Sequence, residues 1–128
     1  MLVIDASALV AIVSGEDDAE NLLDSLAATS RRCVSALNLL EARLVITFGR
    51  GIEAGRLEDL LAKWDIDVVA LDEEMGRLAF DAYQRFGKGR HAAHLNMGDC
   101  AAYALAKARG WPLLFKGDDF SQTDVERA

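Results

Sequence analysis

The strongest constraint on the fold of this 128-residue chain is an alternation of short apolar runs with segments of helical periodicity. The runs expected to form strands are residues 2–4, 33–35, 67–71 and 112–115. Successive strands that are joined through helices run parallel and are connected by right-handed crossovers. The pattern therefore predicts an α/β fold, a three-layer domain with a central, mostly parallel sheet flanked by helices.

The helical segments carry their own start and stop signals. Ser7 is expected to cap the first helix and Gly15 to end it. In the helix after the second strand, Leu37, Leu40 and Leu44 share one face, which we expect to face the core. Further helices are expected near residues 17–26, 52–64, 75–86 and 99–109. No linker or internal repeat interrupts this order, so residues 1–128 are predicted to form a single domain.

The composition is typical of a cytoplasmic protein with a sizeable core. Apolar residues make up 52% of the chain, yet no apolar run approaches the roughly 18 residues of a membrane span. The first residues lack the basic region of a signal peptide, so Cys33 and Cys100 are expected to be free, buried thiols. The net charge of −7 argues against broad, non-specific binding of nucleic acid. It still allows a nuclease with local basic residues, and it suits a basic partner.

Acidic residues stand where strands end and where a helix begins. Asp5 follows the first strand, while Asp118 and Asp119 follow the last. Asp99 lies at the start of a helix, where the helix dipole favours an anion. In an open parallel sheet such positions meet outside the carboxyl ends of the strands, where ligands bind. Taken singly, each acid also has a simpler interpretation as a helix cap or part of a solvated turn.

Glu41 is different because it lies inside an apolar helix, with Asn38 one turn earlier on the same side. Alone, it could simply extend to solvent. Acids gathered at one rim would repel one another, and their pKa values would be raised unless a cation were bound. Oxygen ligands without Cys or His favour Mg²⁺, with Mn²⁺ as a substitute. Such a site can activate water for attack on a phosphodiester, with one or two metal ions.

The segments that carry these acids resemble the four motifs of the PIN-domain family, and the resemblance extends over nearly the whole chain. The matching segments are residues 3–9, 39–42, 98–106 and 112–120. Residues 87–96, the Lys-Gly-Asp-Asp-Phe turn and Thr123-Asp124 are similar to one branch of the VapC toxins in that family. Each motif is short, but four in this order and spacing are specific.

The resemblance implies a PIN-like fold and a magnesium-dependent endoribonuclease that acts as the toxin of a toxin–antitoxin pair. It also implies a VapB-type antitoxin as partner, a homodimeric toxin, and contact with DNA only through the antitoxin. Asp5, Glu41 and Asp99 carry over as metal-site acids. Ser7 carries over as a hydroxyl that orients them, and we expect Asn38 to orient Glu41 in the same way.

The fourth acid departs from the family pattern. Many relatives have an acid at the position of Gly117, so either Asp118 or Asp119 is expected to replace it as a catalytic and metal-binding residue. The loop of residues 87–98 carries glycines, basic residues and both histidines. The candidates for contacts with RNA phosphates are Lys88, Arg90, His91 and Lys116. A charged loop exposed to solvent is the simpler interpretation of the same residues.

Two other functions remain open on sequence grounds. The chain could be a phosphatase or phosphotransferase with Asp5 as nucleophile, although a haloacid-dehalogenase pattern would place a second Asp at position 7, where this chain has Ser7. It could also be a catalytically weak co-repressor module bound to an antitoxin. Cleavage of RNA by wild type and Asp5→Asn distinguishes these functions.

Overall fold

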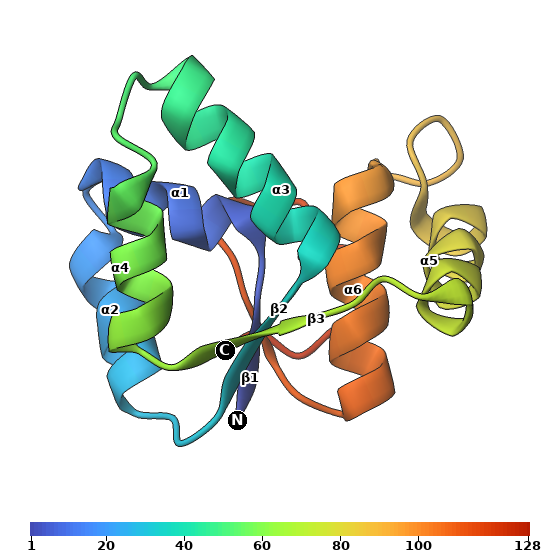
Figure 1. Ribbon diagram of the computed structural model, residues 1–128. Coiled ribbons are helices and arrows are strands. Elements are labelled where there is room, and N and C mark those ends of the chain that lie inside the picture. Colours follow the sequence, from blue (N-terminus) through green and yellow to red (C-terminus); the bar gives the residue numbers. More distant parts are fainter.

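The computed structural model describes residues 1–128 and contains one sheet of four parallel strands (Figure 1). The strands are β1 (Leu2–Ile4), β2 (Arg32–Ser35), β3 (Ile66–Val69) and β4 (Leu113–Leu114), in the order β3-β2-β1-β4. The helices are α1 (Ala6–Ser14), α2 (Ala19–Ala27), α3 (Ala36–Leu44), the π-helical turn η1 (Val45–Gly49), α4 (Gly55–Lys63), α5 (Glu73–Phe86) and α6 (Met97–Arg109). The predicted alternation of strands and helices is confirmed.

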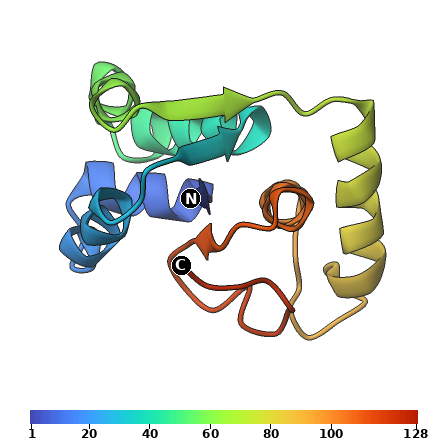
Figure 2. The same cartoon turned by 90° about the horizontal axis from the view of Figure 1, so that it is seen from below.

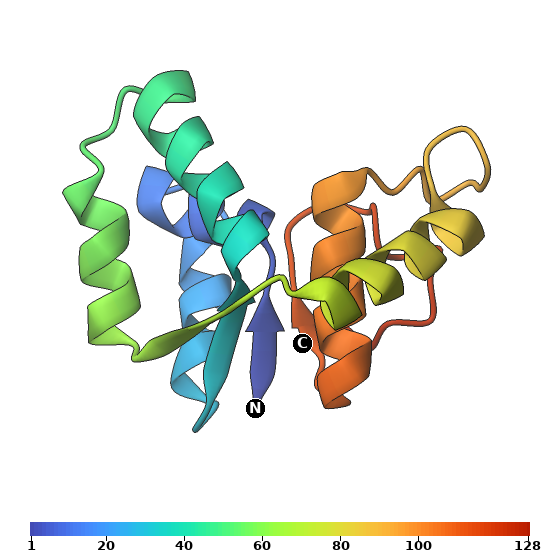
Figure 3. The ribbon, with the colours of Figure 1, turned by 45° about the vertical axis from the view of Figure 1, so that its right-hand side comes forward.

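The sheet lies between two layers of helices, and one layer contains more helices than the other. Helices α1 to α4 cover one face, while α6 packs against β1, β2 and β4 on the other. Helix α5 packs mainly on α6 and stands outside it (Figures 2 and 3). The three-layer α/β architecture expected from the sequence is therefore present, with α6 as the central helix of the second layer.

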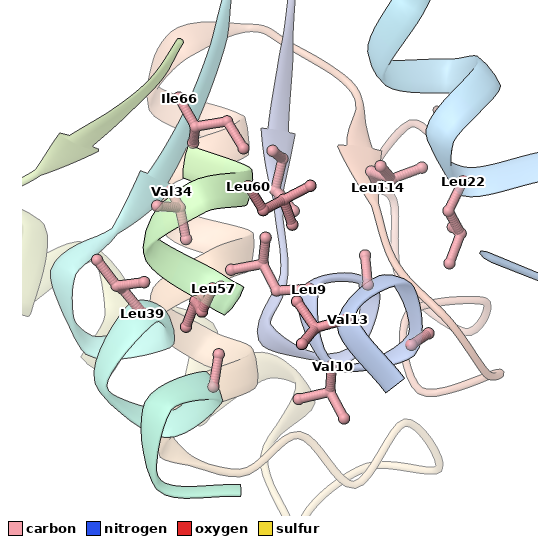
Figure 4. Close-up of a cluster of buried hydrophobic side chains, with 14 of the residues drawn as sticks. Leu9, Val10, Val13, Leu22, Val34, Leu39, Leu57, Leu60, Ile66 and Leu114 are labelled. Atoms are coloured by element: carbon pink, nitrogen blue, oxygen red, sulfur yellow. The ribbon is translucent and has the colours of Figure 1, made fainter. Parts of the chain in front are cut away.

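Strand periodicity divides the core into two clusters, because successive side chains of a strand point to opposite faces of the sheet. Leu2 and Ile4 enter the cluster under α1 to α4, together with Leu9, which is fully buried (Figure 4). Val3 lies between them in sequence and enters the cluster under α5 and α6. Burial on both faces explains why β1 is a continuous apolar run rather than an alternating one.

The core-facing side of α3 was predicted wrongly. Leu40 and Leu44 are about half exposed, whereas Asn38, Leu39 and Ala42 face the interior. The helix has two stripes with helical spacing, and the small Ala42 allows the closer approach to the neighbouring elements. The stripe that contains Leu40 and Leu44 is left on the surface.

Two local predictions also need correction, while others are confirmed. The N-cap of α1 is Asp5 and not Ser7, but Gly15 ends the helix as expected, with a left-handed φ of 66°. The third strand covers Ile66–Val69 and leaves the sheet before Leu71. Both cysteines are free and buried, as predicted. None of the helices has the length and apolar character that crossing a membrane requires.

Candidate active site

Asp5 lies at the carboxyl end of β1 and is 5% exposed. Its Oδ2 accepts hydrogen bonds from the Ser7 amide at 3.0 Å and from the Ser7 hydroxyl at 2.6 Å. The Ser7 hydroxyl in turn accepts a hydrogen bond from the Lys116 amide, 3.0 Å away, just beyond β4. Ser7 therefore fixes the Asp5 carboxylate and joins the end of β1 to the end of its neighbour β4, the edge strand of the sheet.

Glu41 lies on α3, and its carboxylate is held next to the first turn of α6. Its Oε1 accepts a 3.0 Å hydrogen bond from Asn38 Nδ2, which also donates to the Gly98 carbonyl at 2.9 Å. A Cβ at Gly98 would overlap the Glu41 carboxylate, so a side chain at this helix position would displace that carboxylate. The predicted pairing of Asn38 with Glu41 is present, and the contact with α6 is an addition to it.

Asp99 belongs to the first turn of α6, next to Gly98. A capping box fixes it there: Asn96 Oδ1 accepts from the Asp99 amide at 2.9 Å, and Asp99 Oδ2 accepts from the Asn96 amide at 3.1 Å. The carboxylate thus stabilises the start of the helix while remaining partly accessible. Asp99 fulfils the cap role that was its simpler interpretation, and it also lies beside the other acids.

The three acids are neighbours at one end of the sheet, as their effects on one another show. Burial, with a smaller contribution from the charge of Glu41, raises the pKa of Asp5 to about 6 against the hydrogen bonds from Ser7. Burial likewise raises the pKa of Asp99 to about 6, with the charges of Asp5 and Asp119 adding to the effect. The pKa of Glu41 is raised by burial and then by Asp99, while its hydrogen bond from Asn38 acts in the opposite direction. Asp5, Glu41 and Asp99 therefore lie close enough together for their charges to act on one another.

The two acids of the last turn differ in their relation to this group. Both are exposed, but only the charge of Asp119 is among the causes that raise the pKa of Asp99. Asp118 supplies its backbone carbonyl to the Ser121 amide and hydroxyl. Between the two candidates for the fourth acid, this effect on Asp99 favours Asp119.

The loop of residues 87–98 is closed at its neck. The Lys88 amide donates to the Leu95 carbonyl at 2.9 Å, and the Leu95 amide donates to the Phe86 carbonyl at 2.9 Å. Leu95 is fully buried, while Lys88 and Arg90 are exposed on the loop between these contacts. The loop is therefore a defined projection from the core that ends at the capping box of α6.

The four basic candidates for RNA contact differ in whether their side chains already form ion pairs or hydrogen bonds within the protein. Lys88 and Arg90 form no ion pair, although Arg90 Nε lies 3.5 Å from the Gln84 carbonyl. His91 packs edge-on against Phe86, and its Nδ1 accepts from the Ala93 amide at 3.0 Å, so its ring helps to shape the loop.

Lys116 is the most engaged of the four. Its Nζ lies 2.6 Å from Glu16 Oε1 and 3.4 Å from Asp18 Oδ1, and Arg50 joins the same group through Glu16 at 3.7 Å. These hydrogen bonds raise the pKa of Lys116, which remains a cation. The side chain therefore links the end of β4 to the turn between α1 and α2. Of the four basic candidates, Lys88 and Arg90 are exposed and form no ion pair.

Comparison with known proteins identifies the fold family. A family model described as a PIN domain matches residues 2–126. The chain belongs to the PIN-domain family. Among curated proteins, this PIN domain is 49% identical to ribonuclease VapC of Mycolicibacterium smegmatis, over 97% of each chain, and 47% identical to ribonuclease VapC30 of Mycobacterium tuberculosis, over 97% of this chain and 95% of that one. These relatives place it in the VapC group.

Solved structures agree with the PIN fold. The chain is similar to Mycobacterium tuberculosis VapC20, a sarcin–ricin loop cleaving toxin, with a TM-score of 0.80 and 14% identity over 100% of this chain and 98% of that one. It is also similar to a chain of a toxin–antitoxin complex from Klebsiella pneumoniae, with a TM-score of 0.75 and 15% identity over 97% of this chain and 93% of that one. At these identities the likeness concerns the fold.

The acids of this PIN domain fit a hard divalent cation, although they are not a closed set of ligands. No three carboxylate, imidazole or thiol groups of the chain are already arranged to hold a metal ion. The neighbouring oxygens are of the type that Mg²⁺ and Mn²⁺ prefer. A bound cation would offset both the burial and the mutual repulsion that raise the three pKa values. The space left by Gly98 keeps the Glu41 carboxylate beside Asp99.

Sequence reasoning missed Gly98 and Asn96. Asn96 is recognisable in retrospect, since Asn followed three residues later by an acid is a cap pattern. Gly98 has a weaker signal: glycine is disfavoured within a helix, so its presence in the first turn beside a site acid indicates a close approach.

Proposed function

We propose that this protein is a magnesium-dependent endoribonuclease and the toxin of a toxin–antitoxin pair. The observation that carries the proposal is the grouping of Asp5, Glu41 and Asp99 at the carboxyl end of a parallel sheet, where burial and, to a smaller extent, their charges raise their pKa values. The 47–49% identity to VapC ribonucleases over nearly the whole chain supports RNA as the substrate.

Each residue of the site has a role in this proposal. Asp5, Glu41 and Asp99 would hold Mg²⁺, or Mn²⁺ in its place, with Asp119 as the fourth acid. A bound ion of this kind supplies Lewis acidity and a water of lowered pKa for attack on the phosphodiester. Ser7 keeps Asp5 in one orientation through its 2.6 Å hydrogen bond. Lys88 and Arg90 would bind phosphates of the RNA and position the strand without reading its bases.

We propose a VapB-type antitoxin as the partner that covers the exposed apolar side chains of α3 and η1. Large apolar side chains are exposed along α3 and η1, with Phe48 82% exposed. An amphipathic segment of the antitoxin could cover them, since apolar anchors at helical spacing suit a helix-in-groove mode. Leu40 precedes Glu41 in this helix, so a basic side chain of the same segment could reach the acids and compete with the cation. DNA would then be contacted only through the antitoxin.

A second copy of the chain is the partner we propose for another apolar surface. A cavity of about 320 Å³ lies between the start of α3, α5 and the start of α6. Phe80 and Met97 line it and are 63% and 72% exposed, respectively. Burial of these side chains against a symmetry-related copy would form a homodimer, the commonest symmetric assembly.

The decisive experiment is cleavage of total cellular RNA, with the ends of the fragments mapped, by wild type and Asp5→Asn. We expect cleavage with Mg²⁺ or Mn²⁺ and none with Ca²⁺ or with EDTA, because Ca²⁺ takes longer bonds and more ligands. Equal cleavage in EDTA would exclude a metal-dependent mechanism. A protein that never cleaves RNA but binds an antitoxin would instead be a co-repressor, and transfer of phosphate to Asp5 would indicate the phosphotransferase.

A further inference from the structure

Asn38 is a fully buried polar residue in the contact between α3 and α6. Its Nδ2 donates both to Glu41 Oε1 on its own helix and to the Gly98 carbonyl, 60 residues later in the chain. A carbonyl can only accept, so the contact with Gly98 fixes which end of the amide points to the acids. One amide group thus determines where Glu41 lies relative to the first turn of α6.

Gly98 completes this contact from the other helix. It occupies the second position of α6, where alanine would be the better helix former. A Cβ there would overlap three atoms of the Glu41 carboxylate, and the glycine has an ordinary helical φ that does not require glycine. The position is therefore explained by the space that Glu41 needs and not by the backbone conformation.

The same amide is poorly suited to a purely structural role. Asn38 Oδ1 is buried and has no hydrogen-bond partner, which disfavours burial of this side chain. An apolar side chain of similar volume would fill the site without leaving an acceptor unpaired. The unpaired Oδ1 therefore suggests that Asn38 is kept for what the two hydrogen bonds of its Nδ2 hold in place, namely Glu41 and the first turn of α6.

We propose that Asn38 and Gly98 together position Glu41 beside Asp99 and so set the affinity of the site for its divalent cation. The inference rests on the proposed function, in which these acids hold Mg²⁺ or Mn²⁺. Asn38 is a positioning residue, since its Nδ2 contacts Glu41 and the Gly98 carbonyl and it acts on the cation through Glu41. Residues that orient metal ligands typically change metal affinity about 10- to 100-fold when they are lost.

The test is a calorimetric titration of the intact protein with Mn²⁺, combined with melting curves in EDTA. Asn38→Leu should bind Mn²⁺ about 10- to 100-fold more weakly than wild type, while its melting temperature in EDTA stays the same or rises. Gly98→Ala should give the same loss, because it displaces the same carboxylate from the opposite side. In a Glu41→Gln background, Asn38→Leu should cause no further loss, since its route to the cation is already removed.

Leu39→Ala is the matched control, because Leu39 is buried on the same helix without contacting Glu41 through a polar group. It should lower the melting temperature and leave the affinity for Mn²⁺ unchanged. Wild-type affinity in Asn38→Leu or in Gly98→Ala, with Glu41→Gln weakened, would overturn the inference. If Asn38→Leu does not fold, the affinity of Gly98→Ala decides. A wild-type protein that binds no Mn²⁺ would instead overturn the proposed function.

Discussion

The backbone amide of Lys116 donates a 3.0 Å hydrogen bond to the hydroxyl of Ser7, 109 residues earlier in the chain. Because that hydroxyl also donates to Asp5, the ends of β1 and β4 and the most buried acid form one connected group. A serine that the sequence suggested as a helix cap is instead the link between the neighbouring strands β1 and β4 at the site.

Ser7→Ala should therefore reduce RNA cleavage about 10- to 100-fold, because Asp5 loses the hydrogen bond that orients it. The free energy of unfolding should fall by about 1–3 kcal/mol, as the Lys116 amide loses its partner. Ser7→Thr, which keeps the hydroxyl, is the control and should retain most activity. Initial cleavage rates and denaturant unfolding measure the two effects, and full activity in Ser7→Ala would contradict the prediction.

The raised pKa values of Asp5 and Asp99 predict how metal-free stability depends on pH. Both carboxyls lose their proton near pH 4 in the unfolded chain but near pH 6 in the folded protein, so the folded state binds more protons between these values. Stability should fall as the pH rises through this window, by about 1 kcal/mol per carboxylate between pH 5 and pH 7.5. Thermal melts in EDTA measure the change, and saturating Mg²⁺ should reverse it. A metal-free protein that is more stable at pH 7.5 would contradict the assignment.

Asp99→Asn separates the chemistry of the site from its structural role. The amide keeps an oxygen that can accept from Asn96, so the cap survives while the charge is removed. Cleavage should be abolished, and metal-free stability at pH 7.5 should rise by about 1 kcal/mol, because repulsion from Asp5 and Asp119 is relieved. A large drop in melting temperature in EDTA would mark Asp99 as structural.

The exposed side chains of Lys88 and Arg90 lead to a prediction about how RNA binding depends on salt concentration. Lys88→Ala with Arg90→Ala should weaken binding and reduce the slope of log K against log salt by up to about 0.7 per lost contact on single-stranded RNA. The position of the cut should stay the same, since phosphate contacts carry no base specificity. Lys63→Ala, which removes an exposed cation from α4, is the control and should leave the slope unchanged. An unchanged slope in the double variant would mean that the loop is only a solvated surface.

Local patterns were sufficient to predict Asp5 and Asp99. A carboxylate directly after a buried strand and another at a helix start follow from neighbours in the sequence, and the parallel topology brings them to the same rim. The same reasoning predicted the wrong face of α3. Both stripes of that helix are spaced for burial, and the choice between them depends on contacts with distant elements, such as that between Asn38 and Gly98.

Contacts between distant segments also explain why the sequence could not identify the fourth acid or the partners of Lys116. Asp118 and Asp119 are adjacent in an exposed turn, and only the placement of that turn relative to α6 distinguishes them. Lys116 was a candidate for contact with RNA phosphates, and its ion pairs with Glu16 and Asp18 were not foreseen because these partners lie about 100 residues away. Sequence periodicity has no access to such pairs.

The closed neck of the 87–98 loop has a consequence for how proteins of this type can diversify. Hydrogen bonds at Lys88 and Leu95 hold the base of the loop, and Leu95 anchors it in the core just before the turn that presents Asp99. Substitutions, insertions or deletions between these anchors therefore leave the acids in register. Exchanging the tip between relatives should therefore change how strongly RNA phosphates are bound, while the position of the cut and the chemistry of cleavage are inherited unchanged.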